Sequence, residues 1–320
     1  MKFVYGPVPS RRLGRSLGVD TIPPKTCNFS CVYCQLGQTT TFINERKDFF
    51  PRKDILQEIQ ERISLIGTEN IDYVTFVGDG EPTLCRSLGW LLKQVKAEFS
   101  IPIAIITNGA HLYLEDVREE LRIADVILPS LDAGFPETFK KVNRPHPSIQ
   151  FKTMIDGMIK FRSIFSGQIW MEYMAVKGYN DTFDELQHIH NHLKKISPDR
   201  VYVNVPIRPP AEKWVKIPSQ ESLSRIKEIL TNVVEIILPE TGEFQVLSKN
   251  VSLLKDEILQ IIKRHPMRFE QLIELLRQKE IENPSEIISE LEQAGLIKRT
   301  IYENKAFFIS TDLKYSYLKP

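Results

Sequence analysis

Three of the four cysteines, Cys27, Cys31 and Cys34, lie within eight residues of one another, whereas Cys85 is distant in the sequence. Three thiolates on one short loop can bind three irons of a cubane cluster and leave the fourth iron open to a small amino acid-like molecule. The alternatives are a zinc knuckle or three unrelated thiols. A structural zinc site needs a fourth ligand nearby, and the next histidine is His111. The spacing therefore favours a [4Fe–4S] cluster held by the three cysteines.

The composition is that of an ordinary globular protein. The chain has 320 residues, of which 42% are hydrophobic and 26% charged, and its formal net charge is +1. Such a charge gives no global attraction to nucleic acid or to a membrane. The N-terminal residues lack the apolar run of a signal peptide, and no apolar stretch approaches the ~20 residues that span a bilayer. We therefore expect a cytoplasmic protein without membrane association, in which crowded cysteines bind metal instead of forming disulfides.

Short β-rich runs alternate with amphipathic helical patterns from about residue 15 to residue 232. The predicted strands are Ser16–Thr21, Tyr73–Val77, Ile103–Thr107, Val126–Leu131, Ile169–Val176 and Val201–Val205. The predicted helices are Arg52–Ile66, Arg86–Phe99, Leu112–Leu121, Phe151–Phe165, Phe183–Ile196 and Gln220–Leu230. Because parallel strands need crossover helices, six strand–helix repeats predict a parallel α/β sheet. We expect a partial (β/α)6 barrel, and the pattern leaves a doubly wound open sheet as the alternative.

The pattern changes after residue 237. Residues 238–250 contain a Pro-Glu-Thr-Gly-Glu run typical of a linker. Three short helices, Leu253–Lys263, Phe269–Arg277 and Pro284–Ala294, are then followed by a hairpin of Leu296–Ile301 and Lys305–Ile309. This is the order of elements in a winged-helix domain. The predicted organisation is a catalytic barrel over 1–237, a linker over 238–250 and a small winged-helix-like domain over 251–320.

Winged helices often bind DNA, which makes an iron–sulfur sensor or regulator the competing hypothesis. Residues 251–320 contain eleven Lys and Arg and eleven Asp and Glu, so their formal charges cancel. The third predicted helix carries Glu286, Glu290 and Glu292 and no basic residue. An acidic helix is unsuited to a DNA groove. We therefore favour a role in docking a protein or a substrate.

The motif Cys-x3-Cys-x2-Cys after the first predicted strand resembles the signature of the radical S-adenosylmethionine (radical SAM) superfamily. This resemblance implies a [4Fe–4S] cluster and S-adenosylmethionine as cofactors, with Tyr33 beside the adenine. Gly80-Glu81-Pro82 resembles the family's GGEP motif. The resemblance implies that Gly80 offers its backbone there and that Glu81 reaches the methionine amino group.

Further matches lie at later strand ends. Thr107 and Asn108 end the third predicted strand, and Ser130 with Asp132 ends the fourth, where the family places ribose and carboxylate contacts. Glu172 resembles the glutamate of a fifth-strand motif, at a shortened offset. Each match alone is a common turn sequence. Together they lie at the C-terminal ends of parallel strands, where β/α folds place their sites.

Several segments are similar to one branch of the superfamily, the uncharacterised proteins related to the tRNA wyosine-base synthases. They are Gly6–Gly14, Pro23–Thr26, Pro129–Ala133, Asn143–Pro145 and Arg208–Glu212. The resemblance covers about residues 3 to 232. Those synthases carry elements for a second cluster, whereas Cys85 is the only thiol left here. The tRNA activity is therefore not implied.

The resemblance implies an oxidoreductase-type enzyme that receives one electron from a flavodoxin or ferredoxin, cleaves S-adenosylmethionine and abstracts hydrogen from a substrate. A modified nucleoside, a peptide and a cofactor precursor all remain open as substrates, and RNA and protein both remain open as the macromolecular partner. An electron carrier is disfavoured, because a carrier needs no cosubstrate pocket. Arg11, Arg12 and Arg15 form either a solvated segment or an anion clamp, and Arg144 and Arg208 are further clamp candidates.

Overall fold

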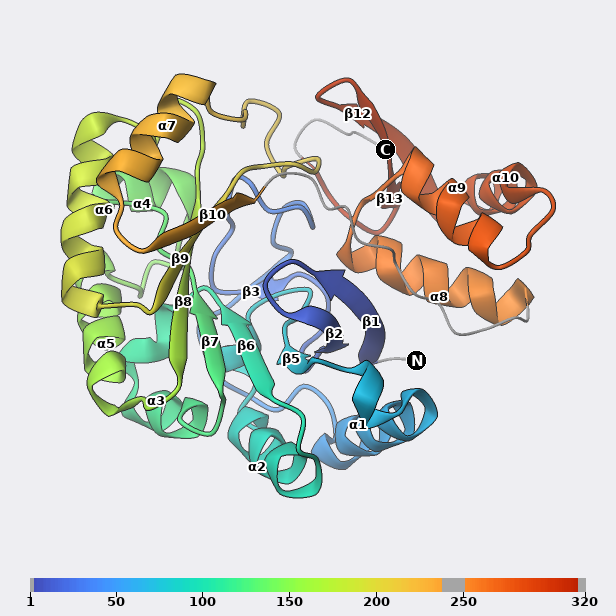
Figure 1. Ribbon diagram of the computed structural model, residues 1–320, viewed down its shortest axis with the longest axis horizontal. Helices are drawn as coiled ribbons and strands as arrows, with labels where there is room; N and C mark the ends of the chain where they lie inside the picture. The colour runs from blue at the N-terminus through green and yellow to red at the C-terminus, as the bar shows by residue number, and fades with distance from the viewer. Residues whose placement is uncertain (1–2, 238–250, 316–320) are drawn as a thin grey trace.

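The computed structural model describes residues 3–237 and 251–315, whose main element is an eight-stranded sheet with the strand order β1-β2-β5-β6-β7-β8-β9-β10 (Figure 1). Its strands are β1 Val4–Ser10, β2 Gly14–Val19, β5 Tyr73–Phe76, β6 Ile103–Thr107, β7 Val126–Pro129, β8 Gln168–Met174, β9 Arg200–Asn204 and β10 Val233–Ile237. β1 pairs antiparallel with β2, and every later pairing is parallel. The predicted parallel α/β sheet is confirmed.

The strand order decides between the two predicted architectures. A doubly wound sheet reverses its strand order at a switch point, whereas here the parallel strands follow one another in chain order from β2 to β10. Figure 1 shows α2, α3, α5 and α6 outside the curved sheet. The sheet is thus a partial barrel, open between β1 and β10.

The helices that cover the sheet are α1 Arg52–Ile66, α2 Leu88–Glu98, α3 Glu115–Leu121, α4 Pro136–Val142, α5 Phe151–Ile164, α6 Phe183–Ile196 and α7 Gln220–Ile229. Their apolar residues recur every three or four positions and face the core; in α1 these are Ile55, Ile59 and Ile63. Short strands β3 (Thr26–Cys27) and β4 (Thr41–Phe42) pair with each other in the connection between β2 and α1.

The C-terminal part consists of α8 Val251–Arg264, β11 Met267–Arg268, α9 Phe269–Gln278, α10 Pro284–Gln293, β12 Ile297–Tyr302 and β13 Lys305–Ser310. The last two strands form a hairpin, and β11 pairs with β13 on its other side. The three helices and the hairpin lie where the sequence predicts them. The predicted linker, 238–250, lies outside the described residues.

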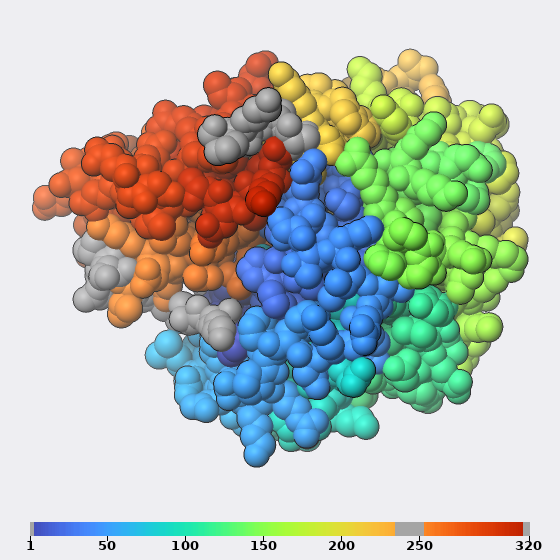
Figure 2. Space-filling model, turned by 180° about the vertical axis from the view of Figure 1, so that it is seen from behind, coloured from blue at the N-terminus to red at the C-terminus, as the bar shows by residue number. Residues whose placement is uncertain are grey.

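The C-terminal part packs directly on the N-terminal strand of the barrel. Tyr5 and Val8 of β1 belong to the same buried cluster as Ile258, Leu272 and other apolar residues of α8 to β13. Figure 2 shows from behind that the orange and red C-terminal residues adjoin the blue N-terminal region. Among the residues that the structure describes, no helix has the length and apolarity needed to cross a membrane.

Candidate functional site

The three clustered cysteines lie on a loop that begins at β3. Cys27 is the last residue of β3, and a turn brings the Cys34 N–H to the Cys31 carbonyl at 3.2 Å. All three thiols are free and half-buried. The loop is fixed to the end of α4 because Val32 N donates to the Val142 carbonyl at 2.9 Å. The sequence therefore places three unpaired thiols on one anchored loop.

Nitrogen donors point at all three sulfurs. They are the Phe29 N–H at 3.3 Å and Asn108 Nδ2 at 3.8 Å from Cys27 Sγ, Asn143 Nδ2 at 3.8 Å from Cys31 Sγ, and Lys25 Nζ at 3.4 Å from Cys34 Sγ. Donors of this kind stabilise thiolates bound to iron and tune a cluster's potential. The donor set thus fits an anionic iron–sulfur cluster.

Burial raises the pKa of the Cys27 thiol to about 12 and that of Cys31 well above its ordinary value. Both thiols are therefore protonated in the metal-free chain, and they have to release their protons when they bind iron. Within residues 3–237 and 251–315, no three His, Cys, Asp or Glu side chains converge on a point where they could hold one metal ion. A cubane does not require such convergence, since each thiolate binds a different iron.

Gly80 fixes the chain segment that leads into the first cysteine. A Cβ at Gly80 would lie 1.8 Å from the Thr26 carbonyl oxygen, and the neighbouring Glu81 N–H donates to that oxygen at 3.1 Å. Only glycine permits this backbone approach. Gly80 and Glu81 thus support Cys27 through backbone contacts.

The Glu81 carboxylate is buried and joins the ends of β5 and β6. Oε1 accepts from Thr83 N at 3.0 Å and from the Thr83 and Thr107 hydroxyls at 2.6 Å each, and Oε2 accepts from Asn108 N at 2.7 Å. Burial raises the pKa of Glu81, and these four donors oppose the shift. The carboxylate thereby fixes Thr107 and Asn108. A contact with a methionine amino group has to use the remaining lone pair of Oε2.

Asp132 holds the aromatic residue of the cysteine loop. Its Oδ2 accepts from the Tyr33 hydroxyl at 2.5 Å and from Asn143 Nδ2 at 2.6 Å, and its Oδ1 accepts from Met174 N at 2.8 Å. Burial raises the pKa of Asp132. Asn143 therefore contacts both Asp132 and Cys31. In the sequence, Asn143 stands out only as part of the segment Asn143–Pro145, which is similar to one branch of the superfamily. Its place beside Arg144-Pro145 was the one indication of a role in the site.

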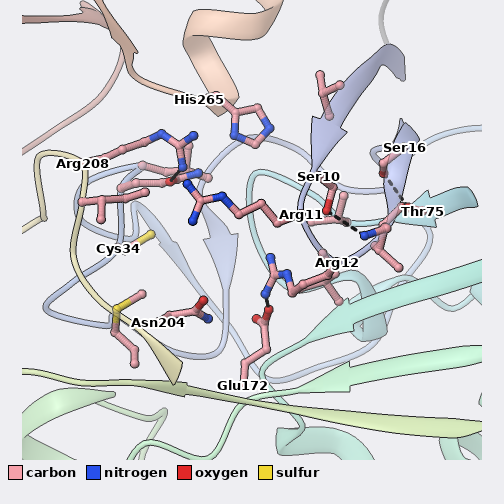
Figure 3. A pocket seen from close by; sticks show the side chains of 18 of the residues that line it. Ser10, Arg11, Arg12, Ser16, Cys34, Thr75, Glu172, Asn204, Arg208 and His265 are labelled. Atoms are coloured by element: carbon pink, nitrogen blue, oxygen red, sulfur yellow. Dashed lines mark hydrogen bonds and ion pairs between the residues drawn. The ribbon is translucent and has the colours of Figure 1, made fainter. Parts of the chain in front are cut away.

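A cavity of about 350 Å³ lies beside the cysteine loop. Its walls come from the β1–β2 hairpin, the ends of β8 and β9, the cysteine loop and the C-terminal part, and it is lined by Tyr33, Cys34 and Glu172 of the predicted site. Figure 3 shows Glu172 pointing toward Arg12, with which it forms an ion pair. Ser130, at the end of β7, is half-buried and bridges to the backbone of Glu172.

The predicted site residues thus form two groups. Tyr33, Ser130, Asp132 and Glu172 surround or adjoin the cavity. The second group lies behind Cys27 and consists of Gly80, Glu81, Thr107 and Asn108. The candidate clamp residues separate: Arg15 pairs with Asp72 at 2.8 Å, and Arg144 pairs with Glu212 at 2.6 Å. Arg11, Arg12 and Arg208 line the cavity.

Comparison with known proteins decides the family. The model of the radical SAM superfamily matches residues 21–193. The chain belongs to the radical SAM superfamily. A UPF0026 protein of Methanocaldococcus jannaschii is 36% identical over 314 residues, which cover 97% of this chain and 96% of the relative. A protein named GTPase Obg in Brachyspira hyodysenteriae is 35% identical over 302 residues, covering 94% of this chain but only 44% of that protein.

The fold is shared with a radical SAM methyltransferase from Sphaerobacter thermophilus, with a TM-score of 0.51 and 16% identity over 67% of this chain and 63% of that one. Members of the superfamily bind a [4Fe–4S] cluster and S-adenosylmethionine. This chain is accordingly a radical SAM enzyme with these two cofactors. A DNA-binding sensor is not favoured by these similarities.

Proposed function

We propose that this enzyme reductively cleaves S-adenosylmethionine to a 5′-deoxyadenosyl radical and abstracts hydrogen from a substrate bound in the cavity. The observation that carries the proposal is the position of Tyr33 and Cys34, which line the same cavity as Glu172 and Asn204 on the strand ends. When bound, the cofactors supply the chemistry: one electron from a flavodoxin or ferredoxin breaks a sulfonium C–S bond, and the resulting radical takes a hydrogen atom from a substrate C–H.

The chain itself supplies binding and orientation. Cys27, Cys31 and Cys34 would hold the cluster, and the nitrogen donors around them would stabilise its charge. The proposed S-adenosylmethionine contacts are Tyr33, Gly80, Glu81, Thr107, Asn108, Ser130, Asp132 and Glu172. Most of these groups are held by hydrogen bonds from neighbouring strands, so the site is organised before any ligand binds.

The C-terminal part is proposed to be a winged-helix-like domain over 251–320, joined to the barrel of 1–237 by the segment 238–250. Its helix–strand–helix–helix–hairpin order supports this assignment. Its role is docking and closure of the substrate cavity, because His265, directly after α8, lines that cavity. The formal charges of residues 251–320 cancel, and α10 contains no basic residue, which argues against binding of a DNA groove.

The proposed activity is tested by anaerobic reconstitution of the full chain with iron and sulfide, followed by reduction with dithionite in the presence of S-adenosylmethionine. We expect slow formation of 5′-deoxyadenosine without any substrate, measured by mass spectrometry. Cys31→Ala should form none, and Cys85→Ala serves as the matched control. Protein with an intact cluster that forms no 5′-deoxyadenosine would refute the proposal.

A further inference from the structure

Lys25 is a buried cation in contact with the cysteine loop. The residue is 5% exposed, and its ammonium donates to Cys34 Sγ at 3.4 Å and to the Gly37 carbonyl at 2.7 Å. Among the residues that the structure describes, no carboxylate forms an ion pair with it; Asp79 attracts it only at longer range and also faces Arg264. Burial of a cation is costly unless it is paired. The Cys34 sulfur is the acidic group in direct contact with this charge.

The backbone at this position does not favour a lysine either. Lys25 has a φ of +57°, a left-handed conformation that glycine and asparagine adopt more readily. Hydrogen bonds hold it there: Lys25 N donates to the Asp79 carbonyl at 2.6 Å, and its carbonyl accepts from Thr40 N at 3.2 Å and from Thr41 N at 3.0 Å. A backbone outlier of this kind points to a function of the side chain. The contact between the ammonium and Cys34 is the function that the geometry offers.

The ammonium is held in place through the turn that follows Cys34. Gly37 N donates to the Cys34 carbonyl at 3.0 Å and closes this turn, and Gln38 N donates to the Lys314 carbonyl at 2.6 Å. Gly37 lies against the same segment, since a Cβ at Gly37 would lie 2.0 Å from the Lys314 carbonyl oxygen. The carbonyl that accepts from Lys25 therefore belongs to a turn that the C-terminal part fixes. The ammonium is anchored at both of its contacts.

The other donors at the cysteine sulfurs are neutral. They are the amides of Asn108 and Asn143, each at 3.8 Å, and the Phe29 N–H at 3.3 Å. Within the described residues, Lys25 is the one cation in contact with these sulfurs. A charge-assisted hydrogen bond is about twice as strong as a neutral one, and a charge acts more strongly where water is excluded. Of the four donors, Lys25 therefore has the largest influence on the charge that the ligand set can carry.

We infer that Lys25 is a positioning residue that raises the reduction potential of the cluster by acting through Cys34. The inference rests on the proposed function, since it takes Cys34 as a cluster ligand and a flavodoxin or ferredoxin as the electron donor. Reduction adds one electron, and hence one negative charge, to the cluster. A fixed cation at a ligand sulfur stabilises the reduced state more than the oxidised state. Lys25 itself forms no bond and loses no proton in this step.

The test is a redox titration of the full reconstituted chain, followed by electron paramagnetic resonance. Lys25→Met removes the charge, and Lys25→Gln also removes it but keeps an N–H donor. In both, the ratio of reduced to oxidised cluster at the midpoint of the unmodified chain should fall about tenfold or more, which is a shift of about 59 mV. Lys25→Arg keeps the charge and should restore most of the potential. Lys141→Met is the matched control, because Lys141 is exposed beside Val142, whose carbonyl anchors the cysteine loop. Its potential should equal that of the unmodified chain.

An unchanged potential in Lys25→Met and Lys25→Gln would overturn the inference, as would an equal shift in Lys141→Met. Loss of the cluster in both neutral variants, measured as iron and sulfide content, would also overturn it, because Lys25 would then serve cluster binding and not its potential. Formation of 5′-deoxyadenosine by the unmodified chain is measured in parallel. If it forms while the potentials are equal, only the role of Lys25 is refuted; if the potentials differ and none forms, only the proposed activity is.

Discussion

Arg264 at the end of α8 donates through Nε at 3.2 Å and Nη2 at 3.1 Å to Asp20 Oδ2, just after β2. Asp79 Oδ1 lies 3.9 Å from the same guanidinium, and the ring of Tyr5 lies 4.5 Å from it. All four side chains are buried. One guanidinium of the C-terminal part is therefore shared by two carboxyl groups of the barrel.

Replacing Arg264 with methionine should strongly destabilise the protein. The change keeps much of the side-chain volume but leaves two buried carboxylates without their cation, a loss of about 3–5 kcal/mol. Urea unfolding measures this loss in the free energy of unfolding. Lys263→Met is the control, because Lys263 pairs with Asp312 at the surface, where ion pairs contribute about 0–1 kcal/mol. Equal losses in the two variants would contradict the importance of the buried contact.

Asp79→Asn should change how stability depends on pH. Burial raises the pKa of Asp79, and its Oδ1 accepts no hydrogen bond within the described residues. The stability that the protonated Asp79 side chain contributes is therefore fully present below the pKa of about 4 that it has in the unfolded chain. This stability is lost as the pH rises through the pKa of Asp79 in the folded chain. Because the asparagine side chain cannot ionise, the free energy of unfolding of Asp79→Asn should be higher than that of the unmodified chain between pH 5 and pH 8.

Asp72 provides the control, because its effect on the pH dependence of stability should have the opposite sign. Hydrogen bonds from Arg15 lower the pKa of Asp72. The contribution of Asp72 is present above its unfolded pKa and is lost as the pH falls through the folded pKa. Asp72→Asn should therefore be less stable than the unmodified chain at neutral pH, and the deficit should shrink on acidification. If the free energies of unfolding of Asp79→Asn and Asp72→Asn changed with pH in the same direction relative to the unmodified chain, the raised pKa of Asp79 would be contradicted.

Iron content should depend on the three loop cysteines and not on Cys85. Anaerobically reconstituted protein should contain about four irons and four sulfides per chain, and Cys31→Ala should form no stable cluster. Cys85 is buried in the barrel core, packed among the apolar residues of the sheet and α2. Its replacement by alanine should cost some stability and leave the iron content unchanged. Chemical analysis of iron and sulfide distinguishes the two variants.

Gly80→Ala should impair cluster assembly without touching a ligand. The added Cβ would lie 1.8 Å from the Thr26 carbonyl, so the segment before Cys27 has to move. We expect clearly reduced iron incorporation at unchanged helix content. Gly178→Ala is the comparison: its Cβ meets nothing within 4 Å, although its φ of +75° makes alanine strained by about 1 kcal/mol. Full iron content in Gly80→Ala would show that the contact is dispensable.

The elements of the barrel were predictable because their periodicity is strong and their faces are buried. The helices Arg52–Ile66 and Phe183–Ile196 have the predicted bounds. β1 was missed because Pro7 and Pro9 interrupt its pattern. Proline is tolerated there since β1 is an edge strand, where a missing N–H costs no ladder bond. β10, Val233–Ile237, was also missed and extends the sheet at its other edge.

Part of the site could be predicted, because the cysteines and the strand-end motifs are local in sequence. Contacts between distant segments could not. The ion pair of Arg12 with Glu172, the bond from Asn143 to Asp132 and the packing of the C-terminal part on the cysteine loop depend on the closure of the sheet. No periodicity encodes such contacts. The assignment of Glu81 and Asp132 to cosubstrate binding remains a prediction, and the structure adds their roles in holding Thr107 and Tyr33.

The Tyr315 hydroxyl contacts the cysteine loop at Gln35, 280 residues earlier in the chain. Near it, Gln38 N donates to the Lys314 carbonyl at 2.6 Å, and Leu36 is buried against Leu313. During synthesis at about 5–20 residues per second, the loop therefore precedes this wall by roughly 15 to 55 seconds. Throughout that interval the cysteine loop lacks this wall, and we expect its three thiols to be more accessible to oxidants and to the donor of iron. The contacts of Leu313, Lys314 and Tyr315 can thus cover the cysteine loop only after that loop has already been made.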